Sequence, residues 1–334
     1  MMEKYFPNHS SEFMEAIEGI RGKPVAIMGH VRPDGDCIGS QVGLARCLRD
    51  MGFDVVCYNE HRVPQNCVPF VGDTPFYMSS EGVDTSRVAI TVDCADRKRL
   101  GQTLQDAYPE VYLNIDHHIS NTLYGEHNII DGHSSATGEI LGGMMLDNNM
   151  PMDAAAAQAL YVGIATDTGQ FRFASTTRDT FEICCHLMEK GADPASAAME
   201  LYERESPAKL ALLQRFLASF QYVCDKRACI GIIDDEAWEA TGACKEDTEG
   251  LVDYARSIEG VEIGILLEER DGMLKGSFRA KDKIHRVDQL ARQFNGGGHA
   301  CAAGFNPEST LKEFYPRLVS ALEEHFQSMS GESS

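Results

Sequence analysis

Several features that would define other classes of protein are missing from this sequence. Its 11 cysteines are scattered along 334 residues and include no C-x-x-C pair, which favours free thiols in a reducing cytosol over a disulfide framework. No apolar run is long enough to span a bilayer, so no membrane partner is expected. Residues 1–11 are polar and lack the apolar segment of a signal peptide. We therefore expect a cytoplasmic protein.

Positive charge is also scarce. The chain has 30 lysines and arginines against 51 aspartates and glutamates, which gives a net charge of -21. Such a field opposes tight, sequence-independent binding of long nucleic acid, because that binding relies on a basic surface. It does not exclude a small anionic substrate if bound metal ions supply positive charge locally. We therefore expect any nucleic-acid substrate to be short, and no long duplex as a partner.

The length of the chain suits two domains rather than one. A chain of 334 residues exceeds an ordinary single domain, and 43% hydrophobic residues are enough to form real cores. Helical patterns at residues 191–219 predict a linker between a domain at residues 1–190 and a smaller domain at residues 220–328. Residues 329–334 are expected to form a tail.

The most informative stretch joins an apolar run at residues 25–28 to a helical pattern at residues 40–51. The run predicts a buried strand, and another strand candidate follows the helix, so a strand-helix-strand unit is expected. Between the run and the helix lie His30, Asp34 and Asp36. Taken alone, this turn has two interpretations. Its three side chains bind one or two metal ions, or its acids cap the helix.

Three further apolar runs end in the same chemistry. Residues 88–92 lead into Asp93, residues 111–115 into Asp116-His117-His118, and residues 159–165 into Asp167. If all four runs are strands of a parallel sheet, their carboxyl ends meet at one edge, where such sheets bind ligands. Carboxylates crowded there need cations to offset their repulsion. The sequence therefore predicts an α/β domain, a parallel sheet with flanking helices, that carries a metal cluster.

The C-terminal region predicts a second, smaller α/β domain with a mixed sheet. Strand candidates lie at residues 228–233, 261–267 and 273–278. The dipeptide Asp271-Gly272 between the last two candidates is a hairpin signal.

The motifs in combination resemble the DHH phosphoesterase family. They are His30-x-x-x-Asp34-x-Asp36, Asp93, Asp116-His117-His118, after which the family is called, and Asp167. The run Gly296-Gly297-Gly298-His299 is similar to the signature of the family's C-terminal DHHA1 domain. The resemblance covers nearly the whole chain and is strongest to the stand-alone nanoRNase/pAp phosphatase branch. It implies a catalytic DHH domain followed by a substrate-binding DHHA1 domain.

This resemblance implies a centre of two Mn2+ ions. One ion would be held by His30, Asp34 and Asp93, and the other by Asp36, Asp93, His117 and Asp167, with Asp93 as the bridge. Mixed carboxylate and imidazole ligands suit manganese better than the all-oxygen set that magnesium prefers, although Co2+ or Mg2+ are possible substitutes. Two such ions about 3.5–4 Å apart can activate a water and clamp the phosphorus that it attacks.

The resemblance also implies roles beyond the metal ligands. Asp116 would orient a histidine by accepting its ring N–H. His118 would contact the scissile phosphate or protonate the leaving oxygen. Arg99 has two interpretations, a phosphate contact or a salt-bridge partner.

In the C-terminal domain the resemblance implies phosphate binding. Ser277-Phe278-Arg279 is similar to the family's Ser-x-Arg strand, so Arg279 would grasp a terminal phosphate with two hydrogen bonds, unless it is only a surface arginine. The backbone N–H groups of Gly296, Gly297 and Gly298 would cradle a phosphate, because glycine permits close approach of the backbone. His299 would add a charge-assisted donor.

The implied activity is a manganese-dependent phosphoesterase. It would remove mononucleotides from 5′-phosphorylated oligonucleotides of a few residues and convert pAp to AMP and phosphate. A cyclic-di-AMP or pApA phosphodiesterase is the main alternative within the family, and an inactive nucleotide-binding or sensing protein is the alternative outside it. A homodimer is compatible with either activity.

Overall fold

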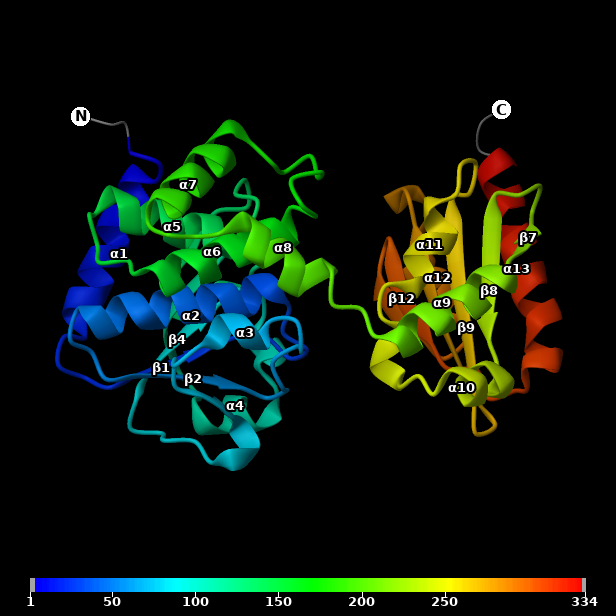
Figure 1. Ribbon diagram of the computed structural model, residues 1–334, viewed down its shortest axis with the longest axis horizontal. Coiled ribbons are helices and arrows are strands. Elements are labelled where there is room, and N and C mark those ends of the chain that lie inside the picture. Colours follow the sequence, from blue (N-terminus) through cyan, green and yellow to red (C-terminus); the bar gives the residue numbers. More distant parts are fainter. Residues whose placement is uncertain (1–3, 332–334) are drawn as a thin grey trace. The chain divides into compact units, whose positions relative to one another are not determined.

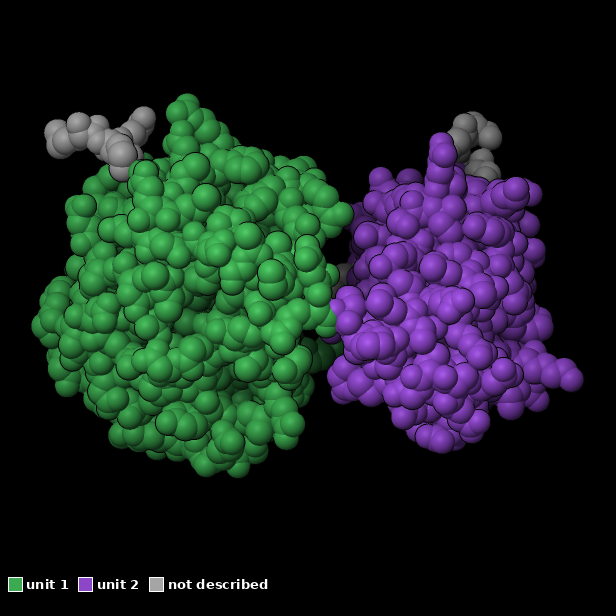
Figure 2. Space-filling view, in the orientation of Figure 1, with its two compact units in different colours: residues 1–204 green, residues 205–334 purple. Residues whose placement is uncertain are grey.

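The chain folds into two compact units that divide between Arg204 and Glu205 (Figure 1 and Figure 2). The computed structural model describes residues 4–331, apart from the side chains of His299 and Ser330. Within that part of the chain, no helix combines the length and the apolar character needed to cross a membrane.

The segment predicted as a linker, residues 191–219, contains two helices. Helix α8 (Pro194–Tyr202) lies in the first unit and helix α9 (Pro207–Ala218) in the second. Leu212 and Phe216 of α9 are fully buried in a core of the second unit. This helix is therefore part of the fold of that unit.

The first unit is built on six parallel strands in the order β3-β2-β1-β4-β5-β6. Their bounds are β1 Val25–Met28, β2 Val55–Asn59, β3 Phe76–Met78, β4 Val88–Val92, β5 Val111–Asp116 and β6 Gly125–Ile130. The predicted parallel sheet is confirmed, and β1, β4 and β5 lie where the apolar runs predicted strands. The strand order reverses between β1 and β4, and parallel sheets bind ligands outside the carboxyl ends of strands at such a point.

Helices cover both faces of this sheet. They are α1 Pro7–Gly19, α2 Gly35–Asp50, α3 Val68–Val71, α4 Gln102–Ala107, α5 Thr137–Asp147, α6 Ala154–Asp167 and α7 Arg178–Glu189. Successive residues of a strand point to opposite faces. Val25 and Ile27 of β1 accordingly join the large core with α2, α5 and α6, whereas Ala26 and Met28 join a smaller core with Leu104 of α4. Figure 1 shows α2, α5 and α6 together on one side of the sheet.

The prediction of a strand at residues 159–165 is wrong, because this segment belongs to helix α6. Four consecutive alanines, residues 154–157, start the helix, and alanine is the strongest helix former. Asp153 caps it by accepting a hydrogen bond from the backbone N–H of Ala156 at 2.7 Å. Asp167 is therefore the last residue of a helix instead of a residue that follows a strand.

Helices α2 and α6 pack almost backbone to backbone. Gly35, Gly39 and Gly43 are spaced four residues apart, so they lie on one face of α2. A Cβ atom at Gly39 would lie 2.3 Å from the carbonyl oxygen of Ala159, and one at Gly35 would lie 2.5 Å from the Thr166 side chain. Only glycine permits this approach. The contact brings the first turn of α2 next to the last turns of α6.

The second unit has a mixed six-stranded sheet in the order β11-β12-β10-β9-β8-β7, in which only the β8–β9 pair is parallel. The strands are β7 Gln221–Val223, β8 Ala228–Ile233, β9 Ile263–Arg270, β10 Met273–Ala280, β11 Gly297–His299 and β12 Ala302–Phe305. The predicted mixed sheet is confirmed. So is the hairpin at Asp271-Gly272, since both residues have the positive φ that such a turn requires, 52° and 74°.

Helices cover both faces of this sheet as well. They are α9, α10 Asp235–Thr241, α11 Leu251–Ser257, α12 Val287–Arg292 and α13 Leu311–Gly331. Residues of α9, α10 and α11 form one core, and residues of α12 and α13 form another. Residues 329–331 of the predicted tail continue α13, and residues 332–334 lie outside the described part of the chain.

The close packing of α2 on α6 can be tested by adding one methyl group at Gly39. Gly39→Ala is expected to lower the free energy of unfolding by about 1–3 kcal/mol, because the added Cβ meets main-chain atoms of α6 that cannot move aside. Thermal and urea unfolding followed by circular dichroism would measure the change. Gly142→Ala in α5 is the matched control, since its Cβ would lie 3.1 Å from a side-chain methyl of Ile183. A Gly39→Ala protein as stable as this control would contradict the packing argument.

A candidate metal centre at the carboxyl edge of the parallel sheet

Polar side chains from five segments converge where the strand order reverses. His30 follows β1, Asp93 follows β4, and the Asp116-His117-His118 run begins with the last residue of β5. Asp36 lies in the first turn of α2, and Asp167 is the last residue of α6. The carboxyl ends of the strands and the packing of α2 on α6 together place these side chains in one cluster.

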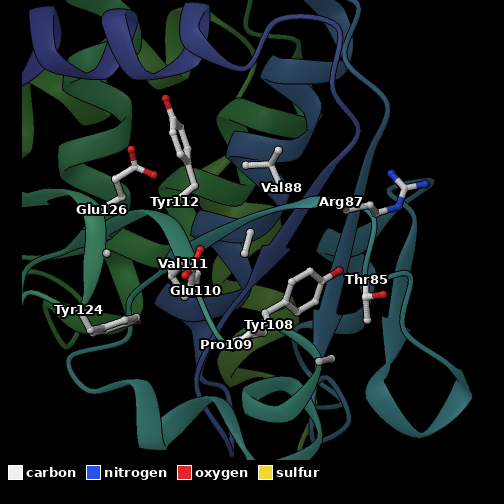
Figure 3. Close-up of a pocket in the computed structure, with 13 residues that line it drawn as sticks. Thr85, Arg87, Val88, Tyr108, Pro109, Glu110, Val111, Tyr112, Tyr124 and Glu126 are labelled. Carbon is white, nitrogen blue, oxygen red and sulfur yellow. The ribbon is translucent and has the colours of Figure 1, made fainter.

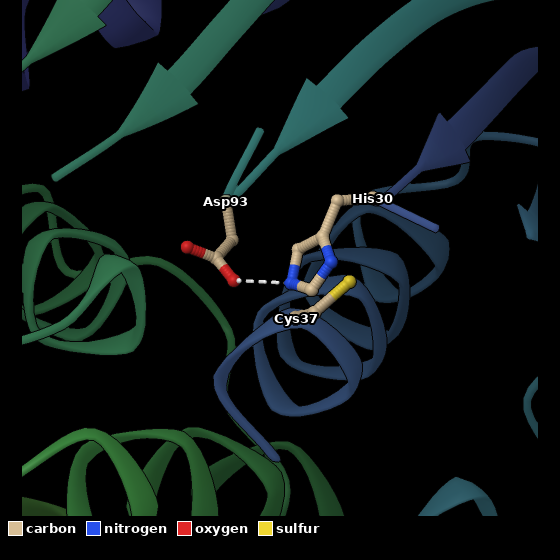
Figure 4. A group of neighbouring side chains, drawn as sticks. All are labelled: His30, Cys37 and Asp93. Atoms are coloured by element: carbon tan, nitrogen blue, oxygen red, sulfur yellow. Dashed lines mark ion pairs between the residues drawn. The ribbon is translucent and has the colours of Figure 1, made fainter. Parts of the chain in front are cut away.

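Asp93 lies at the centre of the cluster. The residue is 2% exposed, and its Oδ2 lies 3.3 Å from His30 Nε2 (Figure 4). Its Oδ1 lies 3.8 Å from His117 Nε2. Its backbone has a left-handed φ of 52°, which aspartate tolerates better than most residues and which is common at functional sites. One carboxylate therefore lies between two imidazoles.

Both imidazoles present the same nitrogen to the cluster. His30 Nδ1 lies 2.9 Å from the carbonyl oxygen of Val31, and His117 Nδ1 lies 3.3 Å from that of Ser134. A carbonyl can only accept a hydrogen bond, so Nδ1 carries the proton in each ring. Nε2 faces the carboxylates in each ring, and it is the nitrogen that would bind a metal ion after loss of its proton.

Asp36 is held by the backbone of α5. Its Oδ2 accepts the N–H of Thr137 at 2.7 Å, and its Oδ1 accepts the N–H of Gly138 at 2.9 Å. A Cβ atom at Gly163 of α6 would lie 2.7 Å from Asp36 Oδ1, so a side chain there would displace the carboxylate. This carboxylate is thus fixed between three helices, and it lies within 4.8 Å of ligand atoms of His117 and Asp167.

Asp34 combines the two interpretations that the sequence left open. Its Oδ1 accepts the N–H of Cys37 at 3.1 Å and so caps α2. Its Oδ2 lies 3.6 Å from His30 Nε2, and the side chain is 58% exposed. One oxygen starts the helix while the other remains available to the cluster.

Burial and mutual repulsion oppose full ionisation of the carboxylates in this cluster. Burial raises the pKa of Asp36 and raises that of Asp93 well above its ordinary value, where Asp36 adds repulsion. Burial and the charge of Asp36 also raise the pKa of Asp167 to about 8. Burial opposes protonation of His30, yet the carboxylates of Asp34 and Asp93 outweigh it and raise the His30 pKa to about 10.

The donor set fits divalent metal ions. Three overlapping groups bring ligand atoms within 4.8 Å of one another: His30, Cys37 and Asp93; Asp93, His117 and His118; and Asp36, His117 and Asp167. Carboxylate and imidazole donors of this kind bind Mn2+ and related ions. Asp93 belongs to two of the groups, which suits a carboxylate shared between two ions.

Asp116 and His118 form a pair beside the cluster. Asp116 is fully buried, and its Oδ1 lies 2.7 Å from His118 Nδ1. The His118 side chain is 34% exposed, so it can reach a bound molecule. Burial raises the pKa of Asp34, but His30 and, to a smaller extent, the charge of Arg99 lower it. Arg99 therefore also lies near the cluster.

In the second unit, the predicted phosphate-binding residues lie on neighbouring strands. Arg279 of β10 pairs with Ala302 of β12, which in turn pairs with His299 of β11. The side chain of Arg279 is half-buried and donates to the carbonyl oxygen of Phe278 at 3.1 Å. The backbone of the glycine run is therefore two strands from Arg279, while the side chain of His299 lies outside the described residues.

The backbone of the glycine run has a positive φ at Gly298. Gly298 has φ of 152°, and a Cβ atom there would lie 2.4 Å from the carbonyl oxygen of Ala302. A Cβ atom at Gly297 would meet nothing within 4 Å, whereas one at Gly296 would lie 2.2 Å from the carbonyl oxygen of Gly304. Gly296 and Gly298 are thus required by pairing with β12, and Gly297 is the open position of the run.

Comparison with known proteins identifies the family. The model of the DHH family, N-terminal domain, matches residues 24–164, and that of the DHHA1 domain matches residues 236–328. The bifunctional oligoribonuclease and PAP phosphatase NrnA of Thermus thermophilus is 27% identical over 316 residues, which are 94% of this chain and 92% of the relative. The protein of the same name from Bacillus subtilis is 28% identical over 289 residues, 82% of this chain and 86% of the relative. A crystal structure of an exopolyphosphatase-related protein from Bacteroides fragilis has a TM-score of 0.84 at 25% identity and covers 96% of each chain.

This chain is a phosphoesterase of the DHH family. The family, the fold and the enzymatic class predicted from the motifs are thereby confirmed. The residues matched by the DHH model contain every member of the candidate cluster except Asp167, and those matched by the DHHA1 model contain Arg279 and the glycine run.

Two residues of the DHH domain that lie close to the cluster were not predicted. Asn121 donates to Asp116 Oδ2 at 2.6 Å, and its only sequence signal is its place three residues after the DHH motif. The buried thiol of Cys37 lies near His30 and Asp93 (Figure 4). Burial raises the pKa of this thiol well above its ordinary value, so it stays protonated and unreactive.

The DHH domain also has a hollow of ≈ 670 Å³ at the opposite edge of the sheet, where β4, β5 and β6 begin (Figure 3). Tyr108, Tyr124 and Arg87 contribute to its lining. The hydroxyl of Tyr124 donates to the carbonyl oxygen of Cys94, and Arg87 pairs with Asp54 and Asp84. These three side chains already have partners within the fold, and the residues that line the hollow include no histidine. The hollow therefore lacks the mixed carboxylate and imidazole donors of the cluster.

The raised carboxylate pKa values predict how metal binding depends on pH. Asp36, Asp93 and Asp167 are stronger bases in the folded than in the unfolded chain, so the metal-free protein should lose stability as pH rises from about 4 to about 8. Metal binding needs these carboxylates deprotonated. Mn2+ should therefore raise the unfolding midpoint more at pH 8 than at pH 6, as measured by differential scanning fluorimetry after removal of metal with a chelator.

Two variants control this experiment. Asp93→Asn should abolish most of the Mn2+ effect, because it removes the carboxylate between the two imidazoles. Asp106→Asn should leave the effect unchanged, since Asp106 accepts a hydrogen bond only from Gln102 on the exposed side of α4. An equal Mn2+ effect at both pH values would be inconsistent with proton release from the cluster.

Proposed function

We propose that this DHH phosphoesterase is manganese-dependent, releases mononucleotides from short 5′-phosphorylated oligonucleotides and converts pAp to AMP and phosphate. The observation that carries the proposal is the position of the Asp93 carboxylate, with one oxygen toward His30 and the other toward His117. A carboxylate placed in this way suits two adjacent divalent ions. The substrate class is supported by the relatives called oligoribonuclease and PAP phosphatase NrnA.

The proposed ligands of the two ions follow the resemblance to the family. His30, Asp34 and Asp93 would hold the first ion, and Asp36, Asp93, His117 and Asp167 the second. Imidazole nitrogens among the ligands favour Mn2+ over Mg2+, and Co2+ is a suitable substitute. When bound, two such ions supply Lewis-acid stabilisation of the charge that develops on a phosphate under attack.

His118 is the proposed proton donor to the leaving oxygen. An oxygen of the Asp116 carboxylate lies 2.7 Å from its Nδ1, and a carboxylate can only accept a hydrogen bond, so Nδ1 carries a proton. Nε2 is then the nitrogen that gives up a proton. In both proposed substrates the leaving group is an alkoxide, which needs this proton to depart.

The DHHA1 domain is proposed to bind a phosphate group of the substrate. Arg279 would form two hydrogen bonds with a terminal phosphate, and the N–H groups of Gly296, Gly297 and Gly298 would cradle it together with the His299 side chain. Gly297 is the member of this run around which the structure leaves most space. Arg99 is proposed as a further phosphate contact in the DHH domain.

The charge of the chain supports short substrates. At a net charge of -21, long polyanions are repelled, whereas a dinucleotide or pAp places its few phosphates near the local cations of the site.

A substrate panel with Mn2+ tests this proposal. We expect kcat/KM to be highest for pAp and for 5′-phosphorylated RNAs of two or three nucleotides, and to fall with RNA length because the acidic surface repels additional phosphates. Hydrolysis would be followed by chromatography of the products. Preferred opening of cyclic-di-AMP, or preferred cleavage of pApA over pAp and other short RNAs, would instead assign a role in turnover of a cyclic dinucleotide.

The role of Arg279 gives a second test. Arg279→Gln should lower kcat/KM for a 5′-phosphorylated dinucleotide about 10–100-fold, which corresponds to the loss of one or two charge-assisted hydrogen bonds. The same dinucleotide without its 5′-phosphate should be affected much less. Lys281→Gln is the control, since Lys281 donates to the carbonyl oxygen of Ile258 and should not matter. Equal losses on both dinucleotides would rule out recognition of the terminal phosphate.

A further inference from the structure

We propose that Asn121 is a positioning residue that fixes the Asp116–His118 pair for proton transfer to the leaving oxygen. This inference rests on the role of His118 in the proposed function. It assigns a task to a residue in the turn after the DHH motif that touches neither the metal ligands nor a substrate.

The side chain of Asn121 uses all of its main hydrogen-bonding groups. Its Nδ2 donates to Asp116 Oδ2 at 2.6 Å and to Asn114 Oδ1 at 2.8 Å. Its Oδ1 accepts the N–H of Leu123 at 2.8 Å, and its own backbone N–H donates to the carbonyl oxygen of His118 at 3.0 Å. The amide therefore links the turn, the buried carboxylate and strand β5.

The network behind Asn121 determines which way the amide points. Asn114 is fully buried, and its Nδ2 donates to Thr91 Oγ1 at 2.9 Å and to Tyr124 Oη at 3.2 Å. The Tyr124 hydroxyl in turn donates to the carbonyl oxygen of Cys94 at 2.9 Å. Asn114 Oδ1 must consequently face Asn121, where only a donor satisfies it. The amide nitrogen of Asn121, and not its oxygen, is thereby directed at Asn114 and Asp116.

This arrangement divides the two oxygens of Asp116 between two partners. Oδ2 accepts from Asn121, and Oδ1 accepts from His118 Nδ1 at 2.7 Å. A second carboxylate competes for the same nitrogen, because Asp93 Oδ1 lies 3.6 Å from His118 Nδ1. By anchoring Asp116, Asn121 keeps His118 paired with the Asp116 carboxylate and not with that of Asp93.

Loss of the Asn121 amide would remove this anchor. Asp116 Oδ2 and Asn114 Oδ1 would lose the donor that they share, and burial makes such a loss costly. Asp116 could then rotate, and the His118 ring could turn toward Asp93. The metal ligands would keep their own contacts, so metal binding should survive while proton transfer fails.

The affected step is the transfer of a proton to the leaving oxygen during hydrolysis. A water oxygen bonds to phosphorus and releases a proton to solvent, the bond from phosphorus to the leaving ribose oxygen breaks, and that oxygen takes the proton from His118 Nε2. A leaving group that is stable as an anion, such as p-nitrophenolate, needs no such proton. The leaving group therefore reports on the proton donor separately from the rest of the site.

The test compares Asn121→Ala, His118→Ala and the double variant on two substrates with saturating Mn2+. On a 5′-phosphorylated dinucleotide we expect Asn121→Ala to lower kcat about 10–100-fold, within the range attributed to general acid catalysis, with KM nearly unchanged. On bis(p-nitrophenyl) phosphate kcat should change by less than about threefold. The double variant should resemble His118→Ala alone, because both residues act through one proton transfer.

Two controls separate positioning from simple loss of structure. Asn128→Ala removes an asparagine of the same domain whose side chain bonds only with the backbone of Gly125, and it should leave both substrates unaffected. Asn121→Ser keeps one donor and should give an intermediate kcat if the alanine variant folds poorly. The stabilisation of Asn121→Ala by Mn2+ should equal that of the unmodified protein.

Each other result is decisive. Equal losses on both substrates, or no loss on either, would overturn the role of Asn121. If His118→Ala itself shows no dependence on the leaving group, the acid role of His118 fails and the inference fails with it. Inactivity of the unmodified protein on the whole substrate panel would instead refute the proposed function. That outcome differs from failure of the Asn121 role and from failure of the His118 role, because both of these leave the unmodified protein active.

Discussion

The contact between α2 and α6 is the constraint on which the candidate site depends. Three glycines of α2 allow its backbone to approach α6, and a fourth glycine, Gly163 of α6, leaves room for the Asp36 carboxylate. This contact brings Asp36 and Asp167 together, although 131 positions separate them in the sequence numbering. The sheet places His30 and Asp93 by an independent rule, the reversal of strand order between β1 and β4. The two halves of the cluster thus arise from two different packing principles.

The cluster brings several buried carboxylates close to one another. Buried aspartates repel one another, and the helix N-termini and backbone N–H groups around them relieve only part of this repulsion. Without bound cations, the raised pKa values of His30, Asp36, Asp93 and Asp167 favour protons on these groups. The proposed metal ions would remove this repulsion.

The sequence predicts four of the six parallel strands, β1, β2, β4 and β5, and the main polar residues, but it predicts neither β3 nor β6 nor the contacts that hold each polar side chain. The runs before His30, Asp93 and Asp116 are short and bounded by turn signals, which favours strands. The run before Asp167 was misassigned, since periodicity alone cannot distinguish a short apolar strand from a buried helix. Asp167 nevertheless joins the cluster, because the end of α6 reaches the same edge as the strands. Asn121 and the glycines of α2 could not have been predicted, as their roles depend on contacts between distant segments.

The spread of the cluster along the chain has a consequence for how the protein matures during synthesis. The polar residues run from His30 to Asp167, so all of the residues matched by the DHH model must be translated before the last of them exists. A nascent chain that stops short of α6 lacks both Asp167 and the packing partner of α2. The proposed metal ions should therefore bind only after α6 has been made and packed, and chains truncated before α6 should lack them.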